Sequence, residues 1–182
     1  MAQAQAPSPR RRADAVRNSE AVLDAAKAAF AETGADTPMR DIAARAGVGV
    51  GTIYRSYPQR SDLIIAVFRR EVDAAAQAAE DLAAEYPPAQ ALRLWAESFA
   101  HVVATKRGLA GALHSGDPAY QPLPAYFLGE LAPRVQRILD AGAADGTIRS
   151  DVSAEDLIPA LSRLAADGGQ MIGVLLDGLV RA

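Results

Sequence analysis

The chain has 182 residues, half of them hydrophobic, and a formal net charge of −3 at pH 7. This length suits one sizeable domain or a small domain joined to a larger one, and the apolar content argues against general disorder. Because cysteine is absent, disulfides, thiolate metal sites and cysteine nucleophiles are excluded, and no apolar run approaches the about 20 residues that span a bilayer.

The N-terminal residues MAQAQAPSPRRR lack the apolar stretch of a signal peptide. We therefore expect a soluble, cytoplasmic protein with no membrane partner. Residues 1–13 are expected to form a flexible basic arm, because a disordered lead precedes Arg10, Arg11 and Arg12. Two roles are open for these arginines: insertion into an adjacent DNA minor groove, or a solvated tail.

Charge is distributed unevenly along the chain. Residues 1–60 contain nine Arg and Lys against six Asp and Glu, whereas residues 61–182 contain ten against sixteen. Nucleic-acid binding depends on a local basic face, so the negative total does not exclude DNA. Charge counts this small also allow the asymmetry to arise by chance.

Helix-favouring residues dominate and alternating β-branched runs are rare, which predicts an all-α fold of about nine helices. A first helix is expected over residues 14–33, ended by Gly34. Thr37 is expected to cap a second helix that has Pro38 at its first position and stops at Gly47.

A third helix is expected over residues 50–57, before Pro58 ends it, and a fourth opens near Arg60. Pro87 and Pro88 mark the break after the fourth helix. Later helices are expected at about 88–105, 107–115, 125–143, 154–166 and 169–181, with Ser153 capping the helix that starts at 154.

Three glycines at every second position, Gly47, Gly49 and Gly51, raise the question of a phosphate-binding loop. Such a loop needs a preceding strand and the spacing G-x-G-x-x-G or a following Gly-Lys-Ser/Thr. Here the preceding MRDIAARA is helical and neither pattern is present. Two short helices joined by a glycine turn instead predict a helix-turn-helix.

In this motif, Gly47 supplies the left-handed turn, and three apolar residues are expected to lock the two helices together: Ile42, Val48 and Ile53. Thr52, Arg55 and Ser56 then lie on the outer side of the second, recognition helix. Its start, Gly49, Val50 and Gly51, lacks bulk, so the backbone can approach a DNA groove and its free N–H groups favour phosphate oxygens.

The stretch TPMRDIAARAGVGVGTIYRSYPQRSDLIIAVF resembles the DNA-binding domain of the tetracycline-repressor (TetR) family of bacterial transcriptional regulators. The resemblance runs without gaps from about residue 16 to residue 68 and includes AAKAAFAETG, DIAARAGV and GTIYRSY. Further on, DGTIRSDVSAEDLI and LLDGL resemble the ligand-binding part of one branch of that family.

The resemblance implies roles for residues in and after the recognition helix. Tyr54 matches the tyrosine that usually bonds a DNA phosphate, and Thr52 the threonine near the start of that helix. Ser56 replaces a frequent histidine and Gly49 a frequent serine, which implies a weaker backbone contact and a weaker cap. Tyr57 replaces a commoner phenylalanine. Its ring is expected inside, with a phosphate contact from its hydroxyl as the alternative.

Thr37 and Arg40 match positions that touch the DNA backbone or base edges, and Arg60 stands where a lysine commonly binds phosphate. Two roles are open for Arg55: a bidentate pair with guanine, worth roughly 1–3 kcal/mol, or neutralisation of a phosphate. The candidate DNA-binding residues are Thr37, Arg40, Gly49, Val50, Gly51, Thr52, Tyr54, Arg55, Ser56, Tyr57 and Arg60.

The resemblance implies a helix-turn-helix DNA-binding domain over residues 14–60 and a larger helical effector-binding and dimerisation domain over residues 61–182. The protein would then be a homodimer, paired through the last two helices, that leaves a palindromic operator on double-stranded DNA when a small-molecule effector binds. Repression is the usual outcome in the family, and activation stays open.

Apolar residues at helical spacing are candidates for lining the effector pocket, although such a stripe is more often ordinary core. They are Trp95, Phe99, Val102, Val103, Leu109, Leu113, Tyr126 and Phe127. His101 and His114 are candidates for additional polar contacts.

No catalytic residue, cofactor or metal is expected. The two histidines have no acidic partner at ligand spacing, and His114, Ser115 and Asp117 are merely sequence neighbours. Two other classes remain as alternatives. One is an architectural DNA-binding protein with a fully packed core and no effector, and the other is a helical protein-interaction module that does not bind DNA.

Overall fold

The structure, a computed structural model, describes residues 9–167 and 169–181 and confirms the all-α fold. Within these residues, nine α-helices and one 3-10 helix follow one another along the chain, and an isolated bridge between Ile148 and Val180 is the sole β-type pairing. The helices are α1 (Pro9–Thr33), α2 (Met39–Ala46), α3 (Val50–Ser56), α4 (Arg60–Glu85), α5 (Pro88–Gly108), α6 (Ala110–Leu113), η1 (Pro118–Tyr120), α7 (Leu123–Ala144), α8 (Ala154–Ala166) and α9 (Gln170–Leu179).

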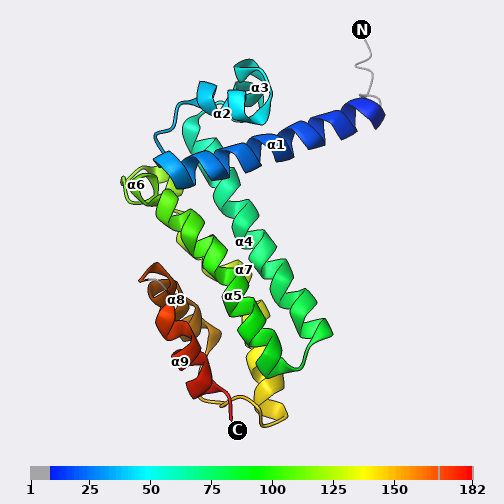
Figure 1. Ribbon diagram of the computed structural model, residues 1–182, viewed down its shortest axis with the longest axis vertical. Coiled ribbons are helices and arrows are strands. Elements are labelled where there is room, and N and C mark those ends of the chain that lie inside the picture. The colour runs from blue at the N-terminus through cyan, green and yellow to red at the C-terminus, as the bar shows by residue number, and fades with distance from the viewer. Residues whose placement is uncertain (1–8, 168, 182) are drawn as a thin grey trace.

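The molecule is elongated (Figure 1). Helices α4, α5 and α7 pack on one another along the long axis, and α1 crosses α4 and α5 near one end. Helices α2 and α3 lie beyond α1 at that end, whereas the C-terminus lies at the opposite end. Helix α8 packs on α5 and α7, and α9 packs on α8. The predicted recognition helix, α3, is therefore at one tip of the molecule.

Helix α1 begins at Pro9 instead of at about residue 14, so residues 9–13 of the expected flexible arm are helical. Proline at the first helical position needs no N–H partner, and the arginines that follow are good helix formers. The side chains of Arg10, Arg11 and Arg12 lie outside the described residues. At the other end of α1, Gly34 adopts a left-handed φ of 85°, as expected for the residue that ends a helix.

The predicted cap of α2 by Thr37 is wrong. The N-cap residue is Pro38, and it makes no side-chain cap. Thr37 is only 8% exposed and its hydroxyl donates to the Gly34 carbonyl at 2.8 Å, with the Thr33 hydroxyl at 2.5 Å. The carbonyls at the end of α1 lack helical partners, and they draw this hydroxyl away from α2.

Other helix boundaries are close to the predicted ones, apart from the end of α5, the length of α6 and the end of α9. Helix α5 continues to Gly108 through Lys106 and Arg107, so α6 is a single turn rather than residues 107–115. Helix α9 is shorter than expected because Val180 leaves the helix to pair with Ile148. The predicted break before α5 and the predicted cap of α8 are confirmed, and the Ser153 hydroxyl accepts the Asp156 N–H at 3.1 Å.

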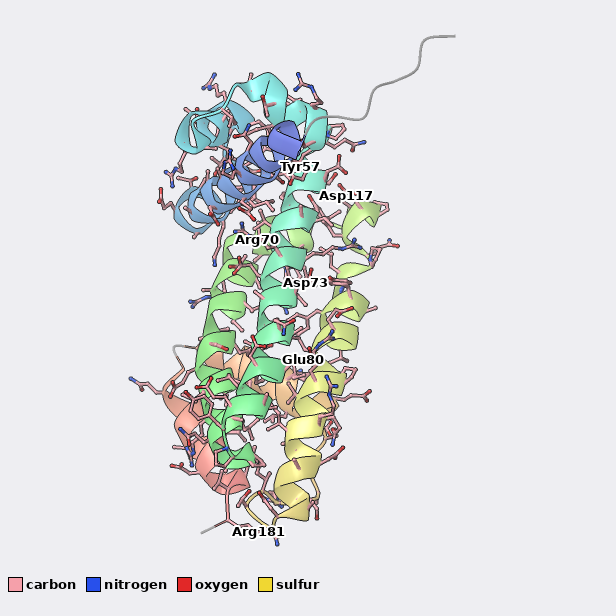
Figure 2. All side chains as sticks on the ribbon, turned by 90° about the vertical axis from the view of Figure 1, so that its right-hand side faces the viewer. Tyr57, Arg70, Asp73, Glu80, Asp117 and Arg181 are labelled. Atoms are coloured by element: carbon pink, nitrogen blue, oxygen red, sulfur yellow. The ribbon has the colours of Figure 1, made fainter. Side chains whose placement is uncertain are left out.

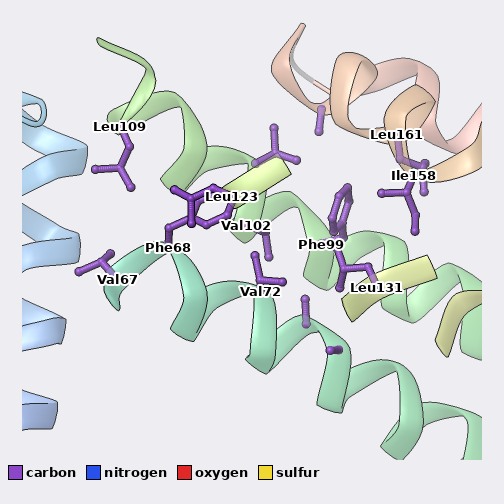
Figure 3. Close-up of a cluster of buried hydrophobic side chains, with 14 of the residues drawn as sticks. Val67, Phe68, Val72, Phe99, Val102, Leu109, Leu123, Leu131, Ile158 and Leu161 are labelled. Carbon is purple, nitrogen blue, oxygen red and sulfur yellow. The ribbon is translucent and has the colours of Figure 1, made fainter. Parts of the chain in front are cut away.

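The hydrophobic core is continuous from the helix-turn-helix to α8 and α9. Figure 3 shows its middle part, where side chains from four helices meet. The labelled residues are Val67, Phe68 and Val72 of α4, Phe99 and Val102 of α5, Leu109 just after α5, Leu123 and Leu131 of α7, and Ile158 and Leu161 of α8, and all of them are buried. Helices α4, α5, α7 and α8 are therefore held together by a shared apolar core.

Candidate DNA-binding surface and effector cavity

The turn between α2 and α3 has the predicted geometry. Gly47 has a left-handed φ of 68°, and the Val48 N–H donates to the Ala43 carbonyl at 3.1 Å. Ile42 and Ile53 are fully buried, with Val48 packed against the same core, so the predicted lock between the two helices is confirmed. Because both helices pack on this core, the outer side of α3 faces the solvent.

This outer side carries most of the candidate DNA-binding residues. Gly49, Val50, Gly51, Tyr54, Arg55 and Ser56 are exposed, and Thr52 is half-buried. Val50 and Tyr54 are large, 41% and 50% exposed, and lie one helical turn apart. Arg55 makes no hydrogen bond or ion pair with any residue that the structure describes, so its guanidinium is available to a partner.

The start of α3 lacks a side-chain cap, as expected from the glycine that stands there in place of the family's frequent serine. Gly49 is the N-cap residue and offers no side-chain cap, and the Thr52 N–H instead bonds the Gly49 carbonyl at 2.8 Å. A β-carbon at Gly49 or at Gly51 would meet nothing within 4 Å. These two glycines are therefore not required by close packing. Because they have no side chains, the backbone itself is exposed at the start of α3.

Two candidates face inward. Thr37 is buried, as described above, and Arg60 Nη1 donates to the Ala35 carbonyl at 2.8 Å and to the Thr37 carbonyl at 2.6 Å. Arg60 therefore fastens the loop between α1 and α2 to the start of α4. The Nη1 atom of Arg60 is thus bonded within the protein, and a phosphate contact from this residue stays a prediction.

Tyr57 also packs mainly inside, at the end of α3 beside α1 (Figure 2). Its ring packs against the core and its hydroxyl lies 3.3 Å from the Ser19 hydroxyl. Arg40 is the opposite case, because its side chain is 81% exposed and, among the described residues, pairs with the adjacent Asp41 alone, at 3.3 Å. Of these two candidates, the exposed surface includes Arg40.

A bidentate ion pair fixes α2 against α1. Arg45 donates to both carboxylate oxygens of Glu32, at 2.8 and 2.7 Å. These hydrogen bonds lower the pKa of Glu32 and raise the pKa of Arg45. Arg45 is thus engaged within the domain and does not add a free charge beside α3.

A cavity of about 410 Å³ lies among α4, α5, α6, η1, α7 and α8. This volume is within the range of small-molecule sites. Of the eight predicted pocket residues, Leu113 and Phe127 line it. A cavity of this size speaks against the architectural alternative, which requires a fully packed core.

The other six predicted pocket residues lie elsewhere. Trp95, Phe99, Val102, Val103 and Leu109 are buried core residues, because α4 and α7 cover the apolar stripe of α5. The hydroxyl of Tyr126 donates to Asp73 on α4, and the Arg69 guanidinium lies 4.8 Å from the centre of its ring. Burial, followed by this hydrogen bond and the charge of Asp73, raises the pKa of Tyr126 to about 12. Tyr126 thus joins α7 to α4 outside the cavity.

Several lining residues escaped the sequence analysis. They are Phe68, Lys106, Tyr120, Leu123, Pro124, Leu128, Pro159, Ser162 and Arg163. A signal for Lys106 was present, because it lies seven residues after Phe99 and hence on the same helical face. The residues of α8 gave no signal, because only the packing of α8 on α5 and α7 brings them to the cavity.

A second cavity, of about 520 Å³, lies where the loop between α1 and α2 meets the start of α4 and the end of α5. Arg60 lines it together with Gly108, at the end of α5, and Tyr120, which also lines the first cavity. Tyr120 is buried, and desolvation followed by the charge of Asp117 raises its pKa. Tyr120 therefore links the candidate effector cavity to the arginine that holds the α1–α2 loop.

Two negative findings concern the part of the chain that the structure describes. None of its helices is both long enough and apolar enough to cross a membrane. No group of three or more His, Cys, Asp or Glu side chains is arranged there to hold a metal ion.

Comparisons with known proteins give matches over most of the chain. The family described as "Bacterial regulatory proteins, tetR family" matches residues 22–67, and the "Transcriptional regulator SbtR-like, C-terminal domain" family matches residues 87–180. No match was found among curated proteins.

Solved structures are similar to this chain over about nine tenths of its length. The TetR transcriptional regulator SCO0520 from Streptomyces coelicolor is 35% identical, with a TM-score of 0.76 over 90% of this chain and 98% of that one. A TetR transcription regulatory protein from Mycobacterium vanbaalenii is 33% identical, with a TM-score of 0.73 over 93% of this chain and 99% of that one. A gamma-butyrolactone receptor (ArpA-like protein) is 20% identical over 92% and 91% of the two chains, with a TM-score of 0.67, which is a likeness of fold alone.

Proposed function

Because the chain belongs to the TetR family of bacterial transcriptional regulators, we propose that it is a homodimeric repressor that binds a palindromic operator and leaves it when a small-molecule effector binds. The family is one of regulators with a helix-turn-helix DNA-binding domain, not of enzymes. Residues 14–60 form the proposed DNA-binding domain, and residues 61–182 bind the effector and the second subunit.

The observation that carries the proposal is the exposed face of α3 at the tip of the molecule (Figure 1). Tyr54 and Arg55 project from a helix that Ile53 anchors in the core. In a helix-turn-helix the second helix enters the major groove, where arginine and tyrosine reach base edges and phosphates. One short helix contacts few base pairs, so two copies spaced about 34 Å apart, one turn of DNA, are needed for tight binding.

Fluorescence anisotropy tests this function. The titration compares DNA from the region upstream of the gene with a shuffled duplex of the same composition, over a series of salt concentrations. We expect tight binding of the native duplex alone, with an affinity that falls steeply as salt rises. If neither duplex binds even at low salt, the DNA-binding proposal is wrong and the protein-interaction alternative gains support.

Arg55→Ala is expected to weaken operator binding by about 1–3 kcal/mol per half-site. If Arg55 reads guanine, the variant loses its preference for the native duplex. If Arg55 binds phosphate, affinity falls uniformly and the salt slope decreases by about one for each half-site, hence by about two for the dimer. Arg137→Ala is the matched control, because Arg137 is an exposed arginine of α7 paired with Glu80. Unchanged binding by Arg55→Ala would remove this residue from the DNA-binding surface.

The proposed dimer interface is supported by an apolar patch on α9. Met171 and Val174 are 54% and 59% exposed, three residues apart on the same side of the helix, whereas Leu176 and Leu179 are buried against the rest of the chain. Large exposed apolar residues that gather on one face are typical of protein interfaces. A second copy related by a two-fold axis would cover the patch with its own α8 and α9.

Val174→Asp is expected to raise the dissociation constant of the dimer at least about tenfold, because two unpaired carboxylates would be buried at the symmetric interface. Sedimentation equilibrium measures the effect. Ala74→Asp is the control, since it adds the same charge at an exposed position of α4. If Val174→Asp associates as tightly as the control variant, α9 is not the interface.

Effector release is proposed to act through the junction of the two cavities. Tyr120 borders the effector cavity and the second cavity, where Arg60 holds the Ala35 and Thr37 carbonyls. A ligand that displaces Tyr120 would alter this anchorage and hence the spacing of the two recognition helices. Release requires that the ligand prefer the non-binding arrangement, since equal affinity for both would shift nothing.

A further inference from the structure

The effector cavity has cationic side chains in its wall but no acidic ones. Lys106 of α5 and Arg163 of α8 line it, and no Asp or Glu does. The inner wall is apolar and includes Phe68, Leu123 and Phe127, of which the first two are buried. The cavity thus combines an apolar interior with two positively charged side chains. This combination suits a ligand that has an apolar body and a negatively charged group.

These cations are not neutralised within the protein. Neither Lys106 nor Arg163 forms an ion pair with any residue that the structure describes, and the Lys106 ammonium instead lies 5.6 Å from the centre of the Phe127 ring. Several other arginines of residues 61–182 do have carboxylate partners. Examples are Arg93 with Asp177, Arg134 with Glu130 and Glu80, and Arg149 with Asp151.

An unpaired hydroxyl lies in the same wall. The Oγ atom of Ser162 is buried and has no hydrogen-bond partner in the structure. Such an atom is rare in folded proteins, because burial without a partner costs free energy. Ser162 and Arg163 lie three and four residues after Pro159, so all three are on one face of α8, and all three line the cavity. A ligand oxygen placed there would satisfy the hydroxyl beside the guanidinium.

We infer that the effector is an amphipathic organic anion, with its carboxylate bound by Arg163, Lys106 and Ser162 and its apolar body against Phe68 and Phe127. This inference rests on the proposed function, because it takes the cavity as the effector site. Arginine binds carboxylates in a bidentate manner, and charge-assisted hydrogen bonds are the stronger ones. The cavity volume, about 410 Å³, accommodates a small ligand.

Isothermal titration of the purified full chain with straight-chain carboxylates, from hexanoate to myristate, tests the inference. The methyl ester of each acid is the neutral probe of matched shape, and each ligand is used below its micelle concentration. We expect at least one carboxylate to bind at least about tenfold more tightly than its ester, which corresponds to about 1.4 kcal/mol. That acid is also expected to lower the affinity for the operator.

Variants assign the preference to the wall residues. The double variant Lys106→Met with Arg163→Gln is expected to bind acid and ester equally, and Ser162→Ala to bind the acid several-fold more weakly. Arg137→Gln removes a cation outside the cavity and is expected to retain the preference, while circular dichroism confirms that each variant is folded. Equal binding of acids and esters, no binding of any acid, or a preference that survives in the folded double variant would each overturn the inference.

Apo DNA binding, measured on the same preparations, separates the two proposals. Specific operator binding with no carboxylate preference would refute the ligand class alone. Absence of operator binding would refute the proposed function, whereas the titration would still report whether the cavity selects anions.

Discussion

Replacing Trp95 with alanine is expected to lower the free energy of unfolding by about 3–5 kcal/mol. The side chain is fully buried in α5 and stacks on Phe99, with ring centres 4.9 Å apart, and its Nε1 donates to the Ala75 carbonyl of α4 at 2.9 Å. Alanine would leave a cavity that helices already packed together cannot fill. Because Phe99 in turn packs against Phe127 of the cavity wall, at 6.0 Å between ring centres, ligand binding should weaken as well.

Trp95→Phe is the matched variant. It retains an aromatic ring against Phe99 and loses part of the volume and the indole N–H bond, with an expected cost of about 1–2 kcal/mol. Trp95 is the only tryptophan in the chain, so denaturant unfolding of both variants is followed by far-UV circular dichroism. Equal stability of the alanine and phenylalanine variants would contradict the close packing of α4 on α5.

Replacing Gly108 with alanine is expected to lower the free energy of unfolding by about 1–3 kcal/mol. A β-carbon at this position would lie 2.8 Å from the carbonyl oxygen of Phe30 and 3.2 Å from the α-carbon of Ala31. These are backbone atoms of α1, so no side-chain rotation relieves the overlap and α5 must shift against α1. Since α1 supports α2 and α3, operator affinity is expected to change together with stability.

Gly111→Ala supplies the control for this substitution. Gly111 lies three residues further on, in α6, where a β-carbon would meet nothing within 4 Å. Alanine there is expected to be neutral or to stabilise by up to about 1 kcal/mol, because glycine is the poorer helix former. Urea denaturation and operator anisotropy are measured on both variants. If Gly108→Ala unfolds at the same urea concentration as Gly111→Ala, the close approach of α1 and α5 is not as described.

The sequence was sufficient to predict the local features of the DNA-binding half. Gly47 at the turn and the buried pair Ile42 and Ile53 follow from glycine chemistry and helical spacing, both of which act over a few residues. Thr37 and Arg60 behaved differently, because their partners are carbonyls of the loop between α1 and α2. Neither helix propensity nor resemblance to a motif indicates which backbone carbonyl outside a helix a side chain will bond.

The residues that line the cavity were harder to predict from the sequence than those of the helix-turn-helix, because tertiary contacts determine them. The stripe from Trp95 to Val103 was correctly recognised as apolar, but burial by α4 and α7 made all four of its predicted pocket residues core rather than lining. Ser162 and Arg163 join the cavity because α8 folds back onto α5 and α7, although they lie 56 and 57 residues after Lys106 in the chain. The sequence by itself determined the helices, the turn and the exposed recognition helix, because these depend on neighbouring residues. Only the tertiary structure decided which helix faces enclose a space and which charges meet in it, because contacts between distant segments set both.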